Sequence, residues 1–169
     1  MTQSTHAPKA ATRAARRAAW LAAAGIATLT ALSSPSQAQA VNAREQAALD
    51  VRYLQTELMV AALSCGRPEF HQHYNVFVAK FGESLRRHAN VMKSYFSRQY
   101  GAQANKHMDT YVTRLANEAS LRSMQQATFC EDSHGLFQRV TALEIASLDG
   151  FSAAIARSKE MVAAGTPTR

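Results

Sequence analysis

Acidic and histidine side chains, which can bind metal ions or transfer protons, gather in two short segments of this 169-residue chain. The first contains Glu69 and His73, which are four residues apart and therefore share a face if the segment is helical. The second contains Asp132 and His134. Metal sites are built from these residue types. The candidate ligands of a metal ion are therefore Glu69, His73, Asp132 and His134.

A purely structural role would explain the same residues, and we favour it. Glu69, Glu131 and Asp132 would occupy the first turns of helices, where carboxylates stabilise the positive helix end. His71 and His73 are two residues apart, about 200° around a helix, and cannot both bind one ion. The sequence has no HxxxH, CxxC or ExxH spacing and no CxxCH haem motif. We therefore expect no bound cofactor.

The two cysteines, Cys65 and Cys130, are the other reactive side chains. An even number of cysteines in an exported protein favours a disulfide, whereas two free buried thiols would be expected if the protein is not exported. Paired cysteines do not act as nucleophiles. The chain also lacks GxSxG, P-loop, dinucleotide-binding and HExxH signatures. We therefore expect that the protein is not an enzyme.

Residues 1–40 have the features of a cleavable signal peptide. A basic segment is followed by an apolar stretch, AAWLAAAGIATLTAL, and then by Ala38-Gln39-Ala40, the small-x-small pattern of a cleavage site. A membrane anchor is the alternative, but the apolar run is shorter than the roughly 20 residues that a span needs. Arg16-Arg17 leaves twin-arginine export open. We expect a periplasmic or secreted protein with no stable membrane anchor after cleavage.

The signal segment accounts for much of the formal charge of +7. Four of the nineteen Lys and Arg residues and no acidic residue lie in residues 1–40, so fifteen remain against twelve Asp and Glu. On the rest of the chain, Arg86, Arg87, Lys93 and Arg98 are interpreted as a solvated helix face rather than a binding patch. No nucleic-acid partner is therefore expected.

The remaining chain has the apolar spacing of helices and no strand-like alternation. Asn42 is suited to cap a helix over 42–64, and Gly66 and Pro68 to end it and begin the next. Gly101 ends the second helix, and a third begins at residue 104 or 105. We expect a break at Cys130–Asp132 and a fourth helix from Ser133, which Gly150 bends or divides.

The segment 68–100 carries the longest apolar row. Its large side chains recur at steps of three and four residues, at Phe70, Tyr74, Phe77, Phe81, Leu85, Met92 and Tyr95. At 1.5 Å per residue this helix would be about 50 Å long, so it either overhangs the domain or kinks near Gly82. His88 falls on the same row. We favour a hydrogen-bonded core residue there over the edge of a ligand pocket.

These elements predict an all-α fold, an up-down four-helix bundle with long helices. In such a bundle the first and third helices end at the same pole, which brings Cys65 and Cys130 together for a disulfide. The predicted domains are the signal peptide 1–40, a helical bundle over 41–164 and a disordered tail over 165–169.

The segments YNVFVAKFGESLRRH, residues 74–88, and RLANEASLRSMQQATFC, residues 114–130, resemble small exported all-helical bacterial proteins of unassigned function. This resemblance implies no activity. The number of aromatic side chains favours an interaction or structural protein that self-associates or binds a protein partner. The alternative is a small-ligand or metal-binding helical bundle. Aromatic side chains suited to an interface rim are Tyr53, Tyr74, Phe96, Tyr100 and Tyr111.

Overall fold

The computed structural model describes residues 40–163, which are helical almost throughout and contain no strand. The predicted signal peptide, apart from Ala40, and the predicted tail lie outside these residues. The five α-helices of the described part are α1 (Ala43–Ser64), α2 (Pro68–Tyr100), α3 (Ala104–Gln125), α4 (Phe129–Ala142) and α5 (Leu148–Ala163). Two short 3-10 turns, η1 (Gly101–Gln103) and η2 (Ile145–Ser147), precede α3 and α5. The all-helical prediction is therefore confirmed.

Local sequence signals explain the first helix boundaries. Asn42 caps α1 through a capping box, in which its side chain accepts from the Glu45 N–H and the Glu45 carboxylate accepts from the Asn42 N–H. Gly66 and Gly101 follow α1 and α2 with φ of 62° and 50°, a left-handed conformation that side chains with a Cβ rarely adopt. Pro68 opens α2, as predicted.

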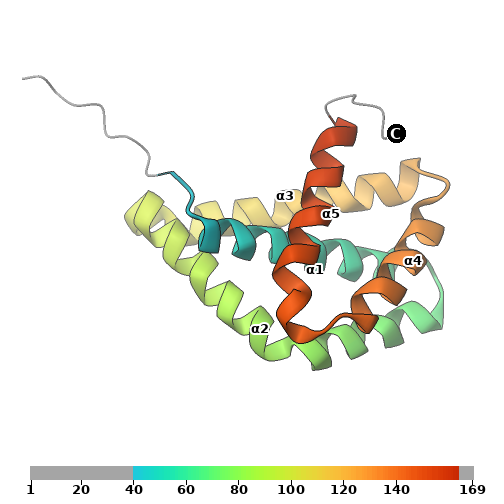
Figure 1. Cartoon of the computed structure of the whole chain (residues 1–169). Helices are drawn as coiled ribbons and strands as arrows, with labels where there is room; N and C mark the ends of the chain where they lie inside the picture. Colours follow the sequence, from blue (N-terminus) through green and yellow to red (C-terminus); the bar gives the residue numbers. More distant parts are fainter. Residues whose placement is uncertain (1–39, 164–169) are drawn as a thin grey trace, which may run out of the picture. The chain divides into compact units, whose positions relative to one another are not determined.

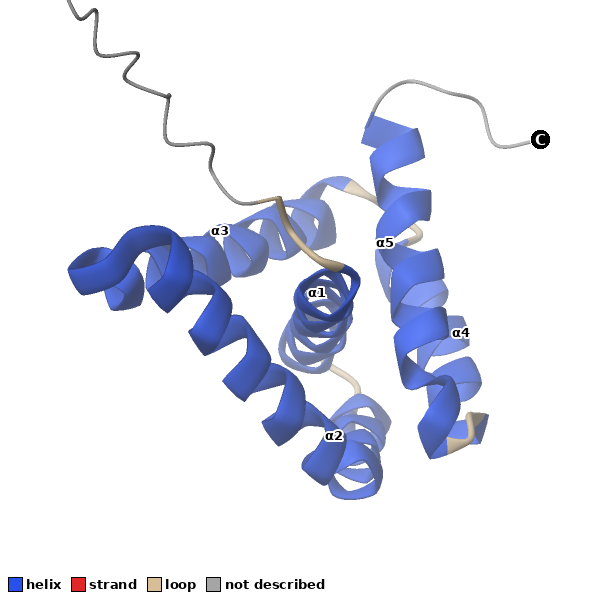
Figure 2. Ribbon diagram, turned by 60° about the vertical axis from the view of Figure 1, so that its left-hand side comes forward, coloured by secondary structure: helices blue, strands red, loops and turns tan. Residues whose placement is uncertain are grey.

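The helix α1 is the centre of the fold, because it packs against α2, α3, α4 and α5. Figure 2 looks nearly along α1 and shows the other helices arranged around it. Its side chains are accordingly buried on several faces, and Leu54 and Leu58 are fully enclosed. Burying a leucine completely stabilises a fold by about 1.5–3 kcal/mol. The aromatic helix α2 is thus a wall of the core rather than its centre.

The core has two parts. The larger lies among α1, α2, α4 and α5, where Phe70, Phe77 and Phe81 of α2 meet Phe137 and Val140 of α4. The smaller lies where the start of α1 meets the end of α2 and the start of α3; its buried members are Ala48, Met92 and Phe96. The predicted row on α2 therefore faces the core. Its basic residues Arg86, Arg87, Lys93 and Arg98 are exposed, as predicted.

The region after Cys130 differs from the prediction. Residues 130–132 belong to the first turns of α4 rather than to a break, and Ser133 is buried inside that helix. Gly150 lies within α5, and the helical run is instead divided at Leu143 and Glu144, whose ψ angles of 145° and 148° are extended. The α5 helix crosses α1 instead of running alongside it (Figure 1). The up-down arrangement of four helices is therefore not confirmed.

Candidate functional site

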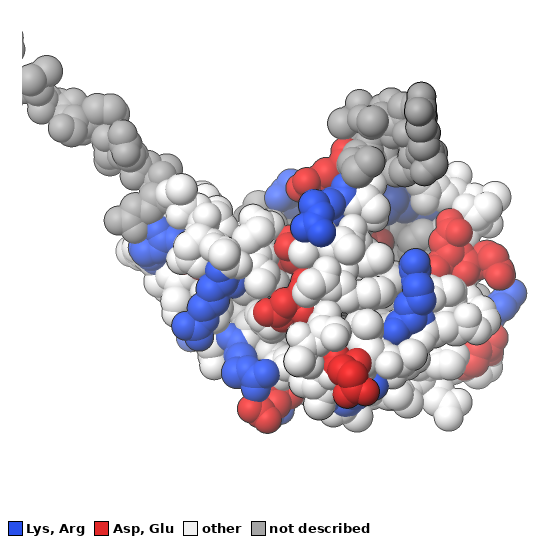
Figure 3. All heavy atoms as spheres, viewed as in Figure 1, with Lys and Arg blue, Asp and Glu red and all other residues white. Residues whose placement is uncertain are grey.

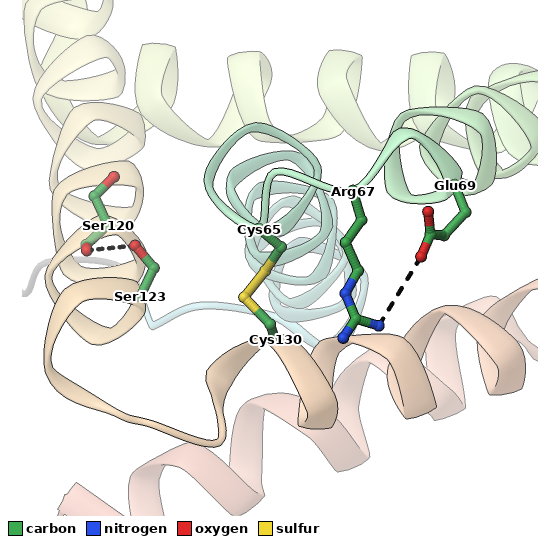
Figure 4. Close-up of a disulfide and its surroundings, with 6 residues drawn as sticks. All are labelled: Cys65, Arg67, Glu69, Ser120, Ser123 and Cys130. Carbon is green, nitrogen blue, oxygen red and sulfur yellow. Dashed lines mark hydrogen bonds and ion pairs between the residues drawn. A yellow bond between two sulfur atoms is a disulfide. The ribbon is translucent and has the colours of Figure 1, made fainter.

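The predicted disulfide is present and joins the end of α1 to the first turn of α4. Cys65 and Cys130 have Cα atoms 5.6 Å apart, and there is no free cysteine in the described chain. Figure 4 shows Arg67 and Glu69 beside this bond, with Nη1 of Arg67 3.9 Å from Oε1 of Glu69. The bond fixes α4 against the central helix at one end of the fold.

The four predicted metal ligands do not come together in this structure. His73 and His134 are neighbours, with ring centroids 6.3 Å apart, and His73 stacks on Phe137 at 5.7 Å. Glu69 faces Arg67 instead, as described above. Asp132 accepts a hydrogen bond from the Thr128 hydroxyl at 3.0 Å. Asp132 and His134 project about 200° apart around α4. Across residues 40–163, no three His, Cys, Asp or Glu side chains are placed to hold a metal ion.

His88 connects two helices. Its Nε2 lies 2.9 Å from Oδ1 of Asp149, in the first turn of α5, and its side chain is 15% exposed. The apolar and polar residues of α1 and α2 around it leave no space for a ligand. The geometry therefore agrees with a hydrogen-bonded residue at the edge of the core, as favoured from the sequence.

A cleft of about 730 Å³ opens between α4 and α5, with α1 at its floor and the end of α3 at one side. Its apolar walls are formed by Phe129 and Leu136 of α4 and Ile155 of α5. Polar residues stand among them, including Arg122, Arg139 and Lys159 and the carboxylates Glu57 and Asp132. This volume lies within the roughly 300–1,000 Å³ typical of small-molecule sites.

A buried ion pair occupies the floor of the cleft. Arg122 of α3 donates to the carboxylate of Glu57 on α1, and only 11% of the Glu57 side chain is exposed. Burial raises the pKa of Glu57, although Arg122 and Lys159 oppose this shift. Burial also raises the pKa of Tyr53, one helical turn away on the same face of α1, and the charge of Glu57 adds to that effect. The floor is thus a poorly solvated polar patch.

A second ion pair ties α5 to α3 beside this patch. Lys159 Nζ donates to Oε2 of Glu118 at 2.5 Å and lies 4.8 Å from the centroid of the Tyr53 ring. The hydrogen bond from Lys159 lowers the pKa of Glu118, and burial only partly offsets this effect. A cation placed above an aromatic face adds an attraction of about 0.5–2 kcal/mol. These contacts hold the far wall of the cleft in place.

Of the polar residues that line this cleft, only Asp132 and Tyr53 were singled out from the sequence as candidate functional residues, and both for other roles. Tyr53 and Phe96 were expected at an interface rim, but they are 8% and 5% exposed. A signal was available in α1, where Tyr53 and Glu57 are four residues apart on a helix that is apolar on several faces. A carboxylate in such a helix requires a cation from another helix.

The comparisons with protein-family models, characterised proteins and solved structures find no match for this chain. The predicted resemblance to small exported helical proteins therefore stays a prediction. None of the helices between residues 40 and 163 has the length and apolar character that a membrane span requires.

Proposed function

We propose that the chain is an exported, non-catalytic binding protein whose cleft between α4 and α5 receives a small molecule with an apolar body. The observation that carries this proposal is the cleft itself, with apolar walls of Phe129, Leu136 and Ile155 around a fixed polar floor. Ligand sites commonly combine mostly apolar walls with a few placed polar groups. The disulfide supports the exported location, because such bonds persist in oxidising compartments.

A fluorescent probe tests this proposal directly. N-phenyl-1-naphthylamine is neutral and apolar, and its emission rises when it leaves water. Ser158 lines the cleft and is exposed, so Ser158→Trp should fill the cleft without removing a core side chain. Ala154→Trp adds the same group to an exposed position of α5 outside the cleft. Binding should be lost in Ser158→Trp alone. Equal binding by both variants would contradict the proposal.

Self-association is the second candidate, and it keeps the interaction role expected from the sequence. Leu63 at the end of α1 and Leu121 and Met124 at the end of α3 are 69%, 49% and 76% exposed. These side chains lie near the ends of two helices that pack against each other, and exposed apolar side chains of this size are candidates for a contact surface. Light scattering of residues 41–169 should then give a mass above the monomer, and Met124→Lys should lower it. A monomer at all concentrations would exclude this candidate.

A further inference from the structure

Building on the proposed function, we infer that the cleft selects an amphipathic anion, a carboxylate on an unbranched or aromatic apolar body, and that Arg139 holds the anionic group. The ligand binds to the cleft as a single molecule from solution, and not as part of an anionic lipid surface. The inference rests on how the charged side chains of the cleft are paired with one another.

Three cations line the cleft, and two of them already have carboxylate partners. Arg122 pairs with Glu57, and Lys159 pairs with Glu118. Arg139 has no carboxylate within ion-pair distance among the described residues, and its guanidinium lies 6.0 Å from the centroid of the Phe151 ring. The cleft therefore has one cation that remains available to a ligand.

The remaining carboxylate of the cleft is too distant to neutralise Arg139. Asp132 is seven residues earlier on α4, which places it on the same face but two turns away, about 10 Å along the helix. Its Oδ2 accepts a hydrogen bond from the Thr128 hydroxyl at 3.0 Å, at the disulfide end. Leu136 lies between the two charges on the cleft wall. A ligand with its anionic group at Arg139 would therefore lay its apolar part along Leu136 and Ile155.

Arginine is also the cation best suited to this task. Its planar guanidinium can donate two parallel hydrogen bonds to one carboxylate, and it is weakly hydrated compared with an ammonium group. Figure 3 shows basic and acidic side chains interspersed over the part of the surface where α4 and α5 lie. A single exposed cation of the cleft that has no carboxylate partner in the described chain, rather than a broad charged patch, therefore determines the preference.

Competition for the bound N-phenyl-1-naphthylamine tests the inference, with decanoate, decanol and decyltrimethylammonium as competitors at pH 8, below their micelle concentrations. The three share a chain length and differ in head-group charge. Decanoate should compete at least about tenfold better than either of the others, as expected for hydrogen bonds to a charged group. Arg139→Ala should remove this preference and leave the concentration of decanol that displaces half of the probe unchanged. Arg139→Lys should restore part of it.

The control variant is Arg157→Ala, which removes one exposed cation of α5 that does not line the cleft. It should leave the preference for decanoate intact. Equal competition by the three compounds, or an equal loss in Arg157→Ala, would overturn the inference while leaving the cleft as a binding site. Decanoate that binds only when anionic vesicles are present would overturn it as well. Absence of probe binding would instead refute the proposed function.

Discussion

Replacing Cys65 and Cys130 together by alanine removes the covalent link between α1 and α4 without leaving a free thiol. The bond spans a sequence separation of 65 residues. The loss of loop entropy that such a link imposes on the unfolded chain gives about 4 kcal/mol at 25 °C. The double variant should therefore lose about 4 kcal/mol of unfolding free energy relative to the oxidised protein.

The melting temperature gives a second estimate of the same effect. A folded region of the size of residues 40–163 has an unfolding entropy of about 0.26 kcal/mol/K. A loss of about 4 kcal/mol of unfolding free energy should therefore lower the melting temperature by about 15 °C. Urea denaturation should also give a larger m value, because the unlinked unfolded chain exposes more surface. Circular dichroism at 222 nm measures both quantities on a protein that comprises residues 41–169.

Reduced wild-type protein is the control, because it lacks the link but keeps both side chains. If the stabilisation comes from the crosslink, the melting temperature of the reduced protein should be close to that of the double variant. If the double variant melts within about 3 °C of the oxidised protein, the entropic reasoning is refuted. A double variant much less stable than reduced wild type would assign the effect to sulfur packing instead.

Four further substitutions test separate features by urea denaturation. Gly82→Ala should stabilise by up to about 1 kcal/mol, since a Cβ there would meet only the end of a side chain at 3.7 Å, whereas Gly66→Ala, at a φ of 62°, should destabilise by a similar amount. Ser152→Ala should stabilise by about 1 kcal/mol, because the fully buried Ser152 hydroxyl has no hydrogen-bond partner among residues 40–163. A clear loss of stability would show that it has one. Because the pKa of Glu118 is lowered, its pairing with Lys159 stabilises the fold above pH 4.5, and this stabilisation is lost as the pH falls through the folded pKa. In Glu118→Gln the free energy of unfolding should therefore fall less steeply between pH 4.5 and lower pH.

The first two helices could be predicted because their boundaries carry local chemical signals. Asn42 can cap a helix, Gly66 and Gly101 accept a positive φ, and Pro68 has no N–H to lose at a first turn. The disulfide was predicted on other grounds, from the even number of cysteines and from a bundle in which the first and third helices end at the same pole. The helix boundaries are a simpler case. Such signals act within a few residues, so no knowledge of tertiary packing was needed.

The division of the last helical run could not be predicted in the same way. The backbone turns at Leu143 and Glu144, which are neither glycine nor proline, and the glycine that invited a break, Gly150, stays helical. Leucine and glutamate both favour helices by intrinsic propensity. Packing therefore decides the break, since Leu148 and Ser152 of α5 become fully buried in the core after it.

This unpredicted break also accounts for the site. After Leu143 the chain reverses, and α5 crosses α1 instead of continuing the line of α4 (Figure 1). The two helices then form opposite walls above the central helix, and the cleft lies between them. Because α1 is covered by other helices on several faces, Glu57 must pair with Arg122 from α3, and Lys159 reaches Glu118 from α5. The position of the break thus determines both the cleft and the pairing of Lys159 with Glu118.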